Sequence, residues 1–215
     1  MPALFICNHV LGLEEIKPGK EIQLLLNAKE LKIIKIDENR KTYTSPQNEY
    51  DATIIEIKNN DVFNLNKILE IDYDIYEACP LNQLYRNKSI YIIHYLLFLN
   101  SSYSNDVIKN FDIDNIKIEY LCATEEGSSG SPIMNLQNFK VIGIHLGNKK
   151  KNKHKEINIG IILKAPIESF NKINRQENLT TIIQEKNINK NRIINIDIKQ
   201  NENLKSLILN EKNET

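Results

Sequence analysis

Short strand-like runs recur along this chain, and they restrict its fold more than any other feature. Each run is rich in β-branched and aromatic residues, and turn-prone segments such as "IKPGKE" and "DENRKT" separate them. Many short strands without long helical patterns between them predict an all-β sandwich or barrel. The weakly patterned stretch 66–88 is interpreted as a link between two halves. The predicted strands cover residues 3–7, 21–27, 31–36, 53–57, 89–96, 116–123, 131–135, 140–146 and 157–163.

The chain changes character after the last predicted strand. The stretch "APIESFNKI" has a proline near its start and apolar residues at helical intervals, so it predicts a C-terminal helix over 165–173. Residues 174–215 are rich in Asn, Lys and Ile, contain no Gly or Pro, and keep no clean period. We expect them to form a helical or partly disordered polar tail.

Composition narrows the classes of function. The 215 residues carry 28 basic and 28 acidic side chains, so charge favours neither nucleic acid nor an anionic membrane as a partner. No run approaches the roughly 18 apolar residues of a membrane span. The three cysteines are widely spaced and the four histidines do not cluster, so we expect no disulfide framework, metal or cofactor. Few cysteines and no visible signal peptide favour the cytoplasm, although location and oligomeric state stay open.

The most informative stretch is "TEEGSSGSPIM", residues 124–134. Its residues 127–132 are all Gly, Ser or Pro, in a chain with only 7 glycines. Such clusters are commonly plain turns. Here, however, the strand-like runs "IKIEYLCAT" and "FKVIGIHLG" flank the cluster. A tight loop between buried strands can hold a serine rigidly and expose the backbone N–H groups that an oxyanion hole requires. Ser129 is therefore a candidate nucleophile, which would need a base and an orienting acid.

A histidine and an aspartate in suitable contexts lie upstream. His9 follows the strand-like run "ALFIC", and Asp51 precedes the run "ATIIEIK". Considered alone, His9 is explained as a histidine at the end of a strand, and Asp51 as a residue that caps the start of one. Together with Ser129 they give the order His, Asp, Ser, which is the chymotrypsin-type order and differs from those of subtilisin and α/β-hydrolases. The sequence thus predicts a catalytic triad of His9, Asp51 and Ser129.

The motifs "NHV", "YDATIIEI" and "GSSGSP" resemble those of the chymotrypsin-like serine endopeptidases. With "VIGIHLG" behind it, "GSSGSP" is most similar to the bacterial glutamyl endopeptidase branch. The resemblance covers about residues 3–172 and implies two six-stranded β-barrels with a cleft between them. It implies His9 as general base and acid, Asp51 as its orienting group and Ser129 as nucleophile, with the N–H groups of Gly127 and Ser129 as oxyanion donors.

The same resemblance implies the domain organisation and two departures from the family. A protease domain would span 1–172, with a first barrel in 1–70, a second barrel in 86–164 and the helix in 165–173. Family members carry about two strands before the histidine, whereas eight residues precede it here. We therefore expect an incomplete first barrel with an unpaired edge. Ser128 stands where digestive members have an aspartate that pairs with a new N-terminus, so activation by that ion pair is not expected. Ser131 falls where the family has a small structural residue.

Three residues are implied in substrate binding by their positions in the family: Thr124, His145 and Gly147. In the glutamyl branch a Thr or Ser and a His bind an acidic side chain, and both groups can donate to a carboxylate. The lysine-rich run 148–155 would add positive potential. Against this, Glu125 and Glu126 are adjacent acids, His145 could simply fill a strand position, and the lysines could form a solvated loop.

The leading hypothesis is a serine endopeptidase that acts on a protein or peptide substrate through an acyl-enzyme and prefers acidic P1 residues. The alternative is a catalytically silent or truncated protease-like fold used as a binding module. A third hypothesis, an unrelated β-sandwich binding module, requires all three motifs to be coincidental.

Overall fold

The computed structural model describes residues 1–26, 29–46, 49–61, 63–64, 68–96, 100–112, 114, 116–152 and 155–176. The chain divides into two compact units, Met1–Phe170 and Asn171–Thr215. All strands described here belong to the first unit. The greater part of the predicted tail, from residue 177 onward, lies outside the described residues. In the described part of the chain no helix combines the length and apolarity needed to cross a membrane.

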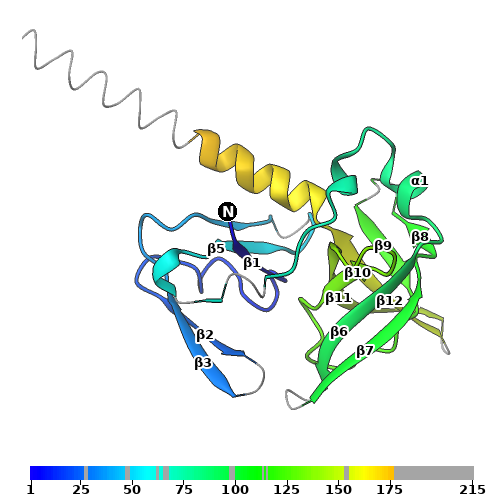
Figure 1. The fold of residues 1–215 in the computed structure, drawn as a ribbon, viewed down its shortest axis with the longest axis horizontal. Coiled ribbons are helices and arrows are strands. Elements are labelled where there is room, and N and C mark those ends of the chain that lie inside the picture. Colours follow the sequence, from blue (N-terminus) through cyan, green and yellow to red (C-terminus); the bar gives the residue numbers. More distant parts are fainter. Residues whose placement is uncertain are drawn as a thin grey trace, which may run out of the picture. The chain divides into compact units, whose positions relative to one another are not determined.

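The N-terminal half forms two small sheets, drawn in blue and cyan in Figure 1. One sheet has the order β1-β5-β4, and the other is a hairpin of β2 and β3. The antiparallel register places Leu4 opposite Ile55 in the first sheet and Ile22 opposite Ile34 in the second. Isoleucines from both sheets share one core, which therefore joins them. The strands are β1 (Ala3–Ile6), β2 (Glu21–Leu26), β3 (Glu30–Lys35), β4 (Thr42–Thr44) and β5 (Thr53–Glu56); the core residues are Ile16, Ile22, Ile34, Ile36 and Ile55.

The second half is one curled sheet of seven strands in the order β7-β6-β10-β11-β12-β9-β8 (Figure 1). β7 and β8 stand at the two ends of this order, yet only residues 108 and 109 separate them in the chain. Counted as one interrupted strand, they close a six-stranded barrel. The strands are β6 (Ser89–Leu96), β7 (Asn100–Val107), β8 (Asn110–Phe111), β9 (Lys117–Tyr120), β10 (Pro132–Asn135), β11 (Val141–Asn152) and β12 (Lys155–Ile162).

Side chains reinforce this closure. Ser104 Oγ donates to Ala123 O at 2.7 Å, and Asp106 Oδ2 accepts from Leu121 N at 2.6 Å. Both bonds join β7 to the segment that follows β9, so they hold together the two strands that meet where the barrel closes. The interior is filled by β-branched side chains, which pack well on a pleated surface; fully buried members include Ile90, Ile92, Ile118, Ile133, Ile142 and Ile161.

Short helical segments connect the halves and follow the last strand. The linking stretch holds η1 (Asn59–Asp61), η3 (Tyr73–Tyr76) and α1 (Leu81–Tyr85). A longer helix runs over 164–176. In the first unit its Ile167 and Phe170 pack against Tyr43 and Ile54 of the N-terminal sheet.

The predicted all-β fold with a C-terminal helix is confirmed, and β6 has the predicted bounds. Three strands were not predicted: β4, β7 and β8. β7 reads "NSSYSNDV", so it lacks the apolar alternation that marks a strand. It is held as a strand by its antiparallel pairing with β6. The interpretation of the lysine-rich run as a loop is wrong for its first part. β11 continues to Asn152, with Lys149 opposite Ile157 in β12.

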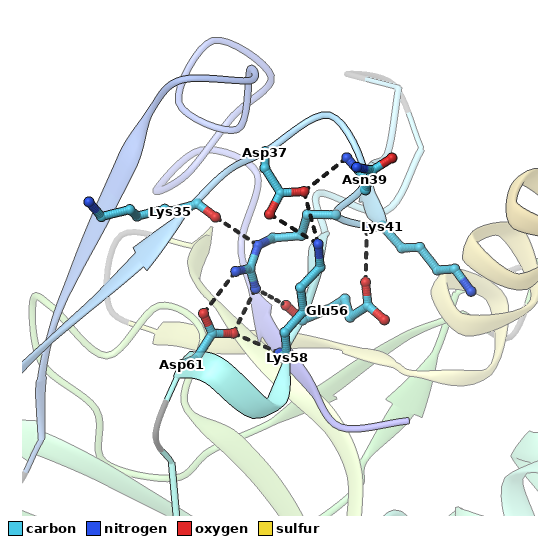
Figure 2. Close-up of polar contacts among 8 residues, drawn as sticks. Lys35, Asp37, Asn39, Lys41, Glu56, Lys58 and Asp61 are labelled. Atoms are coloured by element: carbon cyan, nitrogen blue, oxygen red, sulfur yellow. Dashed lines mark hydrogen bonds and ion pairs between the residues drawn. The ribbon is translucent and has the colours of Figure 1, made fainter.

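A buried ion pair, not predicted from the sequence, ties the end of β5 to η1 and to the turn after β3 (Figure 2). Arg40 donates to both carboxylate oxygens of Asp61 at 2.7 and 2.8 Å, and their side chains are 1% and 5% exposed. Arg40 also donates to Lys35 O and Glu56 O, and Lys58 N donates to Asp61. Each charge is therefore hydrogen-bonded, as burial requires.

Candidate active site

Strand pairing brings His9 and Asp51 together. β1 and β5 are antiparallel with Ile6 opposite Thr53, so the turn after β1 meets the residues before β5. His9 N donates to Asp51 Oδ1 at 2.9 Å, and His9 Nδ1 lies 2.7 Å from Asp51 Oδ2. Because a carboxylate only accepts, this contact places the ring proton on Nδ1 and leaves Nε2 as an acceptor. Both side chains are partly exposed, at 48% and 32%.

The backbone at Asp51 adopts a left-handed conformation, with φ at 50°. Aspartate tolerates this region better than most residues, and such conformations persist only where surrounding bonds hold them. Two neighbours supply those bonds. Asn8 N donates to Asp51 O at 3.2 Å, and Ala52 N donates to Ser45 Oγ at 2.9 Å.

Ser129 lies in the loop between β9 and β10 and meets the same histidine. Its Oγ is 3.0 Å from His9 Nε2 and 3.2 Å from Leu146 O, and its one proton goes to either acceptor. The structure therefore brings together all three residues of the predicted triad, which are separated by 42 and 120 positions in the chain.

Three histidines contact the loop that carries Ser129. Besides His9 at Ser129, His94 Nδ1 lies 3.0 Å from Ser128 Oγ. The backbone of His145 completes the set, because its O accepts from Gly130 N at 2.8 Å and its N donates to Ser131 O at 2.9 Å. Four consecutive loop residues are thus each bonded to a histidine. His94 was not singled out from the sequence, although it continues the buried alternation of Ile90 and Ile92 in β6.

The loop leaves two N–H groups available beside the nucleophile. Among the residues that the structure describes, neither Gly127 N nor Ser129 N donates a hydrogen bond. Gly127 and Gly130 have φ of 89° and 87°, which glycine adopts without strain. A Cβ at Gly130 would also lie 3.3 Å from the Ile6 side chain. These glycines let the chain turn tightly while the two N–H groups stay free.

The residues implied in P1 binding have partners of their own. Thr124 Oγ1 donates to Asn158 Oδ1 at 3.0 Å, and Asn158 Nδ2 donates to Cys122 O. This second bond fixes the amide orientation, so the Thr124 hydroxyl proton is already used. Glu125 and Glu126, which opposed an acidic preference, are exposed.

His145 is buried, at 2% exposure, and its Nδ1 lies 2.7 Å from the Tyr120 hydroxyl. Burial lowers the pKa of His145 to about 4, with repulsion from His94 and His9 adding to the effect. Burial also raises the pKa of Tyr120 well above its usual range, so that residue keeps its proton and can donate it to Nδ1. His145 is therefore neutral near pH 7, with Nε2 as the remaining donor.

Gly147 marks a change in the pairing of β11. The register with β12 shifts between His145 and Gly147, where φ is 149°. On its other side, β11 pairs with β10 only as far as Ile144. Beyond that point, within the described residues, this edge of β11 has no partner strand, and an extended peptide could pair there.

Cys7, His9 and Asp51 have donor atoms within 4.8 Å of one another, a spacing that a metal could bridge. The thiol does not fit that role. Burial, followed by repulsion from Asp51, raises the pKa of Cys7 to about 12, and its Sγ donates to His145 O. A metal ligand must be a thiolate, so the cluster is not a good metal site.

No family model and no curated protein matches the chain. Solved structures do. The HtrA-type protease AlgW with decapeptide is 16% identical, with a TM-score of 0.53 over 80% of this chain and 48% of that chain. The serine endoprotease from Yersinia pestis is 15% identical, with a TM-score of 0.56 over 80% and 54%. The chain spans about half the length of these structures. The likeness shows the chymotrypsin-like β-barrel fold, and it gives no support to the narrower resemblance to the glutamyl branch.

Proposed function

We propose that this protein is a serine endopeptidase that hydrolyses peptide bonds through His9, Asp51 and Ser129. The observation that carries the proposal is the continuous line of contacts Asp51–His9–Ser129, at 2.7 and 3.0 Å. Both distances fall within the reach that nucleophile, base and orienting acid require. The fold shared with an HtrA-type protease and a serine endoprotease supports the proposal, because chymotrypsin-type β-barrels are one of the folds on which this triad occurs.

In acylation, Ser129 Oγ attacks the carbonyl carbon of the scissile bond while its proton passes to His9 Nε2. The carbonyl oxygen becomes an oxyanion and accepts from the N–H groups of Gly127 and Ser129. Protonated His9 then donates its Nε2 proton to the leaving nitrogen, and the C–N bond breaks. The products of this step are a free amine and an ester on Ser129.

In deacylation, water takes the place of the amine. His9 Nε2 removes a proton from the water, whose oxygen attacks the ester carbon. The proton then returns to Ser129 Oγ as the ester bond breaks. Throughout, Asp51 holds the ring through Nδ1 and stabilises the imidazolium that forms twice per turnover.

The substrate would lie extended along the free edge of β11 beside Gly147, with its P1 side chain near Thr124 and His145. A preference for an acidic P1 residue is what the resemblance of these two positions to the glutamyl branch predicts. The contacts favour a second candidate, glutamine. Since Thr124 donates to Asn158 and His145 is neutral near pH 7, the donor that remains at these two positions, His145 Nε2, carries no positive charge. A carboxylate needs its charge offset when it is buried, whereas an amide oxygen needs only a donor.

Labelling with a phosphonofluoridate reagent tests the proposal. Such reagents form a bond to a serine oxygen that a neighbouring base activates. We expect stoichiometric labelling at Ser129, found by peptide mass spectrometry, and its loss in Ser129→Ala. Ser131→Ala is the matched control, since it removes a hydroxyl from the same motif. A folded protein that stays unlabelled would favour the silent binding module, and labelling at Ser128 or Ser131 would refute the assignment.

A further inference from the structure

A second serine–histidine contact lies next to the proposed triad and has no part in the reaction above. Ser128 and His94 are 1% and 3% exposed, and Ser128 Oγ lies 3.0 Å from His94 Nδ1. Side chains alternate along a strand, so His94 points to the same inward face of β6 as Ile90 and Ile92. A buried polar group is costly unless it is hydrogen-bonded, and Ser128 supplies His94 with a partner.

Ser128 is bonded to both ends of the nucleophile loop. Its N donates to Glu125 O at 3.1 Å, and its Oγ accepts from Glu125 N at 3.2 Å. Its O accepts from Ser131 N at 3.0 Å. The side-chain contact with His94 then joins this compact turn to β6, which forms part of the barrel wall and pairs directly with β10.

Ser128 is not a second nucleophile, because its buried Oγ already contacts His94 Nδ1 and accepts from Glu125 N. Its place in the chain gives it another role. Ser128 stands between Gly127 and Ser129, whose N–H groups are the proposed oxyanion donors, so its position sets the direction of both. Misplacement by about 1 Å can cost on the order of 10²-fold in rate.

We propose that His94 is a positioning residue that acts through Ser128 to hold the N–H groups of Gly127 and Ser129 toward the oxyanion. This inference rests on the proposed function. The contact between Ser128 and His94 joins two side chains that need no charge, so the loop holds its shape without an ion pair at position 128. The contact orients the donors and does not touch the substrate.

Four variants test the role: His94→Leu, Ser128→Ala, their double variant and His94→Asn. The Asn side chain has a polar atom at the δ position, as His94 does, and can keep the bond. We expect His94→Leu and Ser128→Ala each to lower kcat on a peptide ester by about 10- to 100-fold, with KM changed less than about 3-fold. The double variant should lose no more than either single variant, and His94→Asn should recover most of kcat.

The control is Ile108→Val, which removes a methyl group from the fully buried core of the same barrel. It should lower the melting temperature and keep kcat. Equal losses of kcat in the control and in His94→Leu at matched stability would overturn the inference, as would a change confined to KM.

A second readout does not depend on turnover and separates this inference from the proposed function. Amide hydrogen exchange at Gly130 and Ser131, whose N–H groups donate to His145 O and Ser128 O, should quicken in Ser128→Ala and His94→Leu, and stay unchanged in Ile108→Val. Unchanged exchange in all variants overturns the inference even if the wild type is an active protease. A wild type that neither labels nor turns over an ester defeats the proposed function, whereas quickened exchange would still support the positioning contact.

Discussion

At the scale of single residues, Asp51 uses both carboxylate oxygens on His9, one on the backbone N–H and one on the ring. Asp51→Asn replaces one acceptor with a donor, so the ring would turn to the tautomer that cannot accept from Ser129. Asparagine also tolerates the left-handed backbone found here, so the fold should persist. We expect turnover of a peptide ester to fall on the order of 10⁴-fold, the size of this change in the trypsin triad.

An unchanged circular-dichroism melt would show that the loss in Asp51→Asn is chemical. A fall of less than about tenfold would contradict the role of Asp51. Without a working triad, only the oxyanion donors and substrate binding support the reaction, and the activity that they leave is far below one tenth of the wild-type value.

His145 gives a prediction about pH. Its pKa of about 4 means that the ring gains a proton only as the pH falls toward that value. A charged ring favours Glu over Gln at P1, so the preference for Glu should weaken as the pH rises through the acid range and become constant above about pH 6. The measurement is the ratio of kcat/KM for two peptides that differ only in Glu or Gln at P1, between pH 4 and 8.

His145→Ala should lower the rate on both peptides and spare a Leu peptide. A ratio that changes steeply between pH 6 and 8 would mean that the bound substrate raises the pKa of His145 into that range. Equal losses on all three peptides would remove His145 from P1 recognition.

At the scale of elements, the pair Arg40–Asp61 joins β5, η1 and the turn after β3 (Figure 2). Burial by itself would raise the pKa of Asp61, but hydrogen bonds from Arg40 and from Lys58 N lower it overall. Removing one partner leaves a buried charge alone, so we expect Arg40→Met to lower the free energy of unfolding by about 3–5 kcal/mol.

Urea unfolding measures this loss. The double variant Arg40→Met, Asp61→Leu should be more stable than Arg40→Met alone, because it leaves no unpaired charge. Lys58→Met is the control, since it removes only the more exposed pair with Asp37 and keeps the backbone bond of Lys58 to Asp61. If Arg40→Met and Lys58→Met cost the same, the buried pair does not hold these elements together.

The elements that the sequence predicted are those whose own residues carry the signal. β5 and β6 are apolar and β-branched. His9 and Asp51 lie in short motifs beside β1 and β5, and Ser129 lies in a Gly/Ser-rich loop. β7 and β4 are polar, and they are held as strands by pairing with β6 and β5. The partners Tyr120, Asn158 and His94 were missed for the same reason. Each contacts the site from a strand 25 or more positions away in the chain, and no local pattern encodes such a pairing.

At the scale of the whole molecule, the site depends on both halves of the first unit. His9 and Asp51 come from the N-terminal sheets, whereas Ser129 and all three residues implied in P1 binding come from the closed barrel. The contact between His9 and Ser129 spans the two halves, as does the bond from Cys7 Sγ to His145 O. Global stability and activity should therefore be lost together when either half loosens.

The last prediction concerns acid. Burial tends to raise the pKa of Asp106, but hydrogen bonds from Val107 and Leu121 N–H and from Lys109 lower it overall, as happens at Asp61. A lowered pKa in the folded state means that the unfolded chain binds protons first. The stabilisation is therefore complete above the ordinary carboxyl pKa of about 4, and it is lost as the pH falls through the lower folded value.

Urea midpoints should be constant from pH 6 to 8 and fall below about pH 4. Asp106→Asn keeps an acceptor for Leu121 N but cannot titrate, so it should lower the midpoint at pH 7 and flatten the acid decline. Ile108→Val changes no titratable group, so it should lower the urea midpoint by the same amount at every pH. An acid decline as steep in Asp106→Asn as in the wild type would show that closure of the barrel at Asp106 does not depend on its charge.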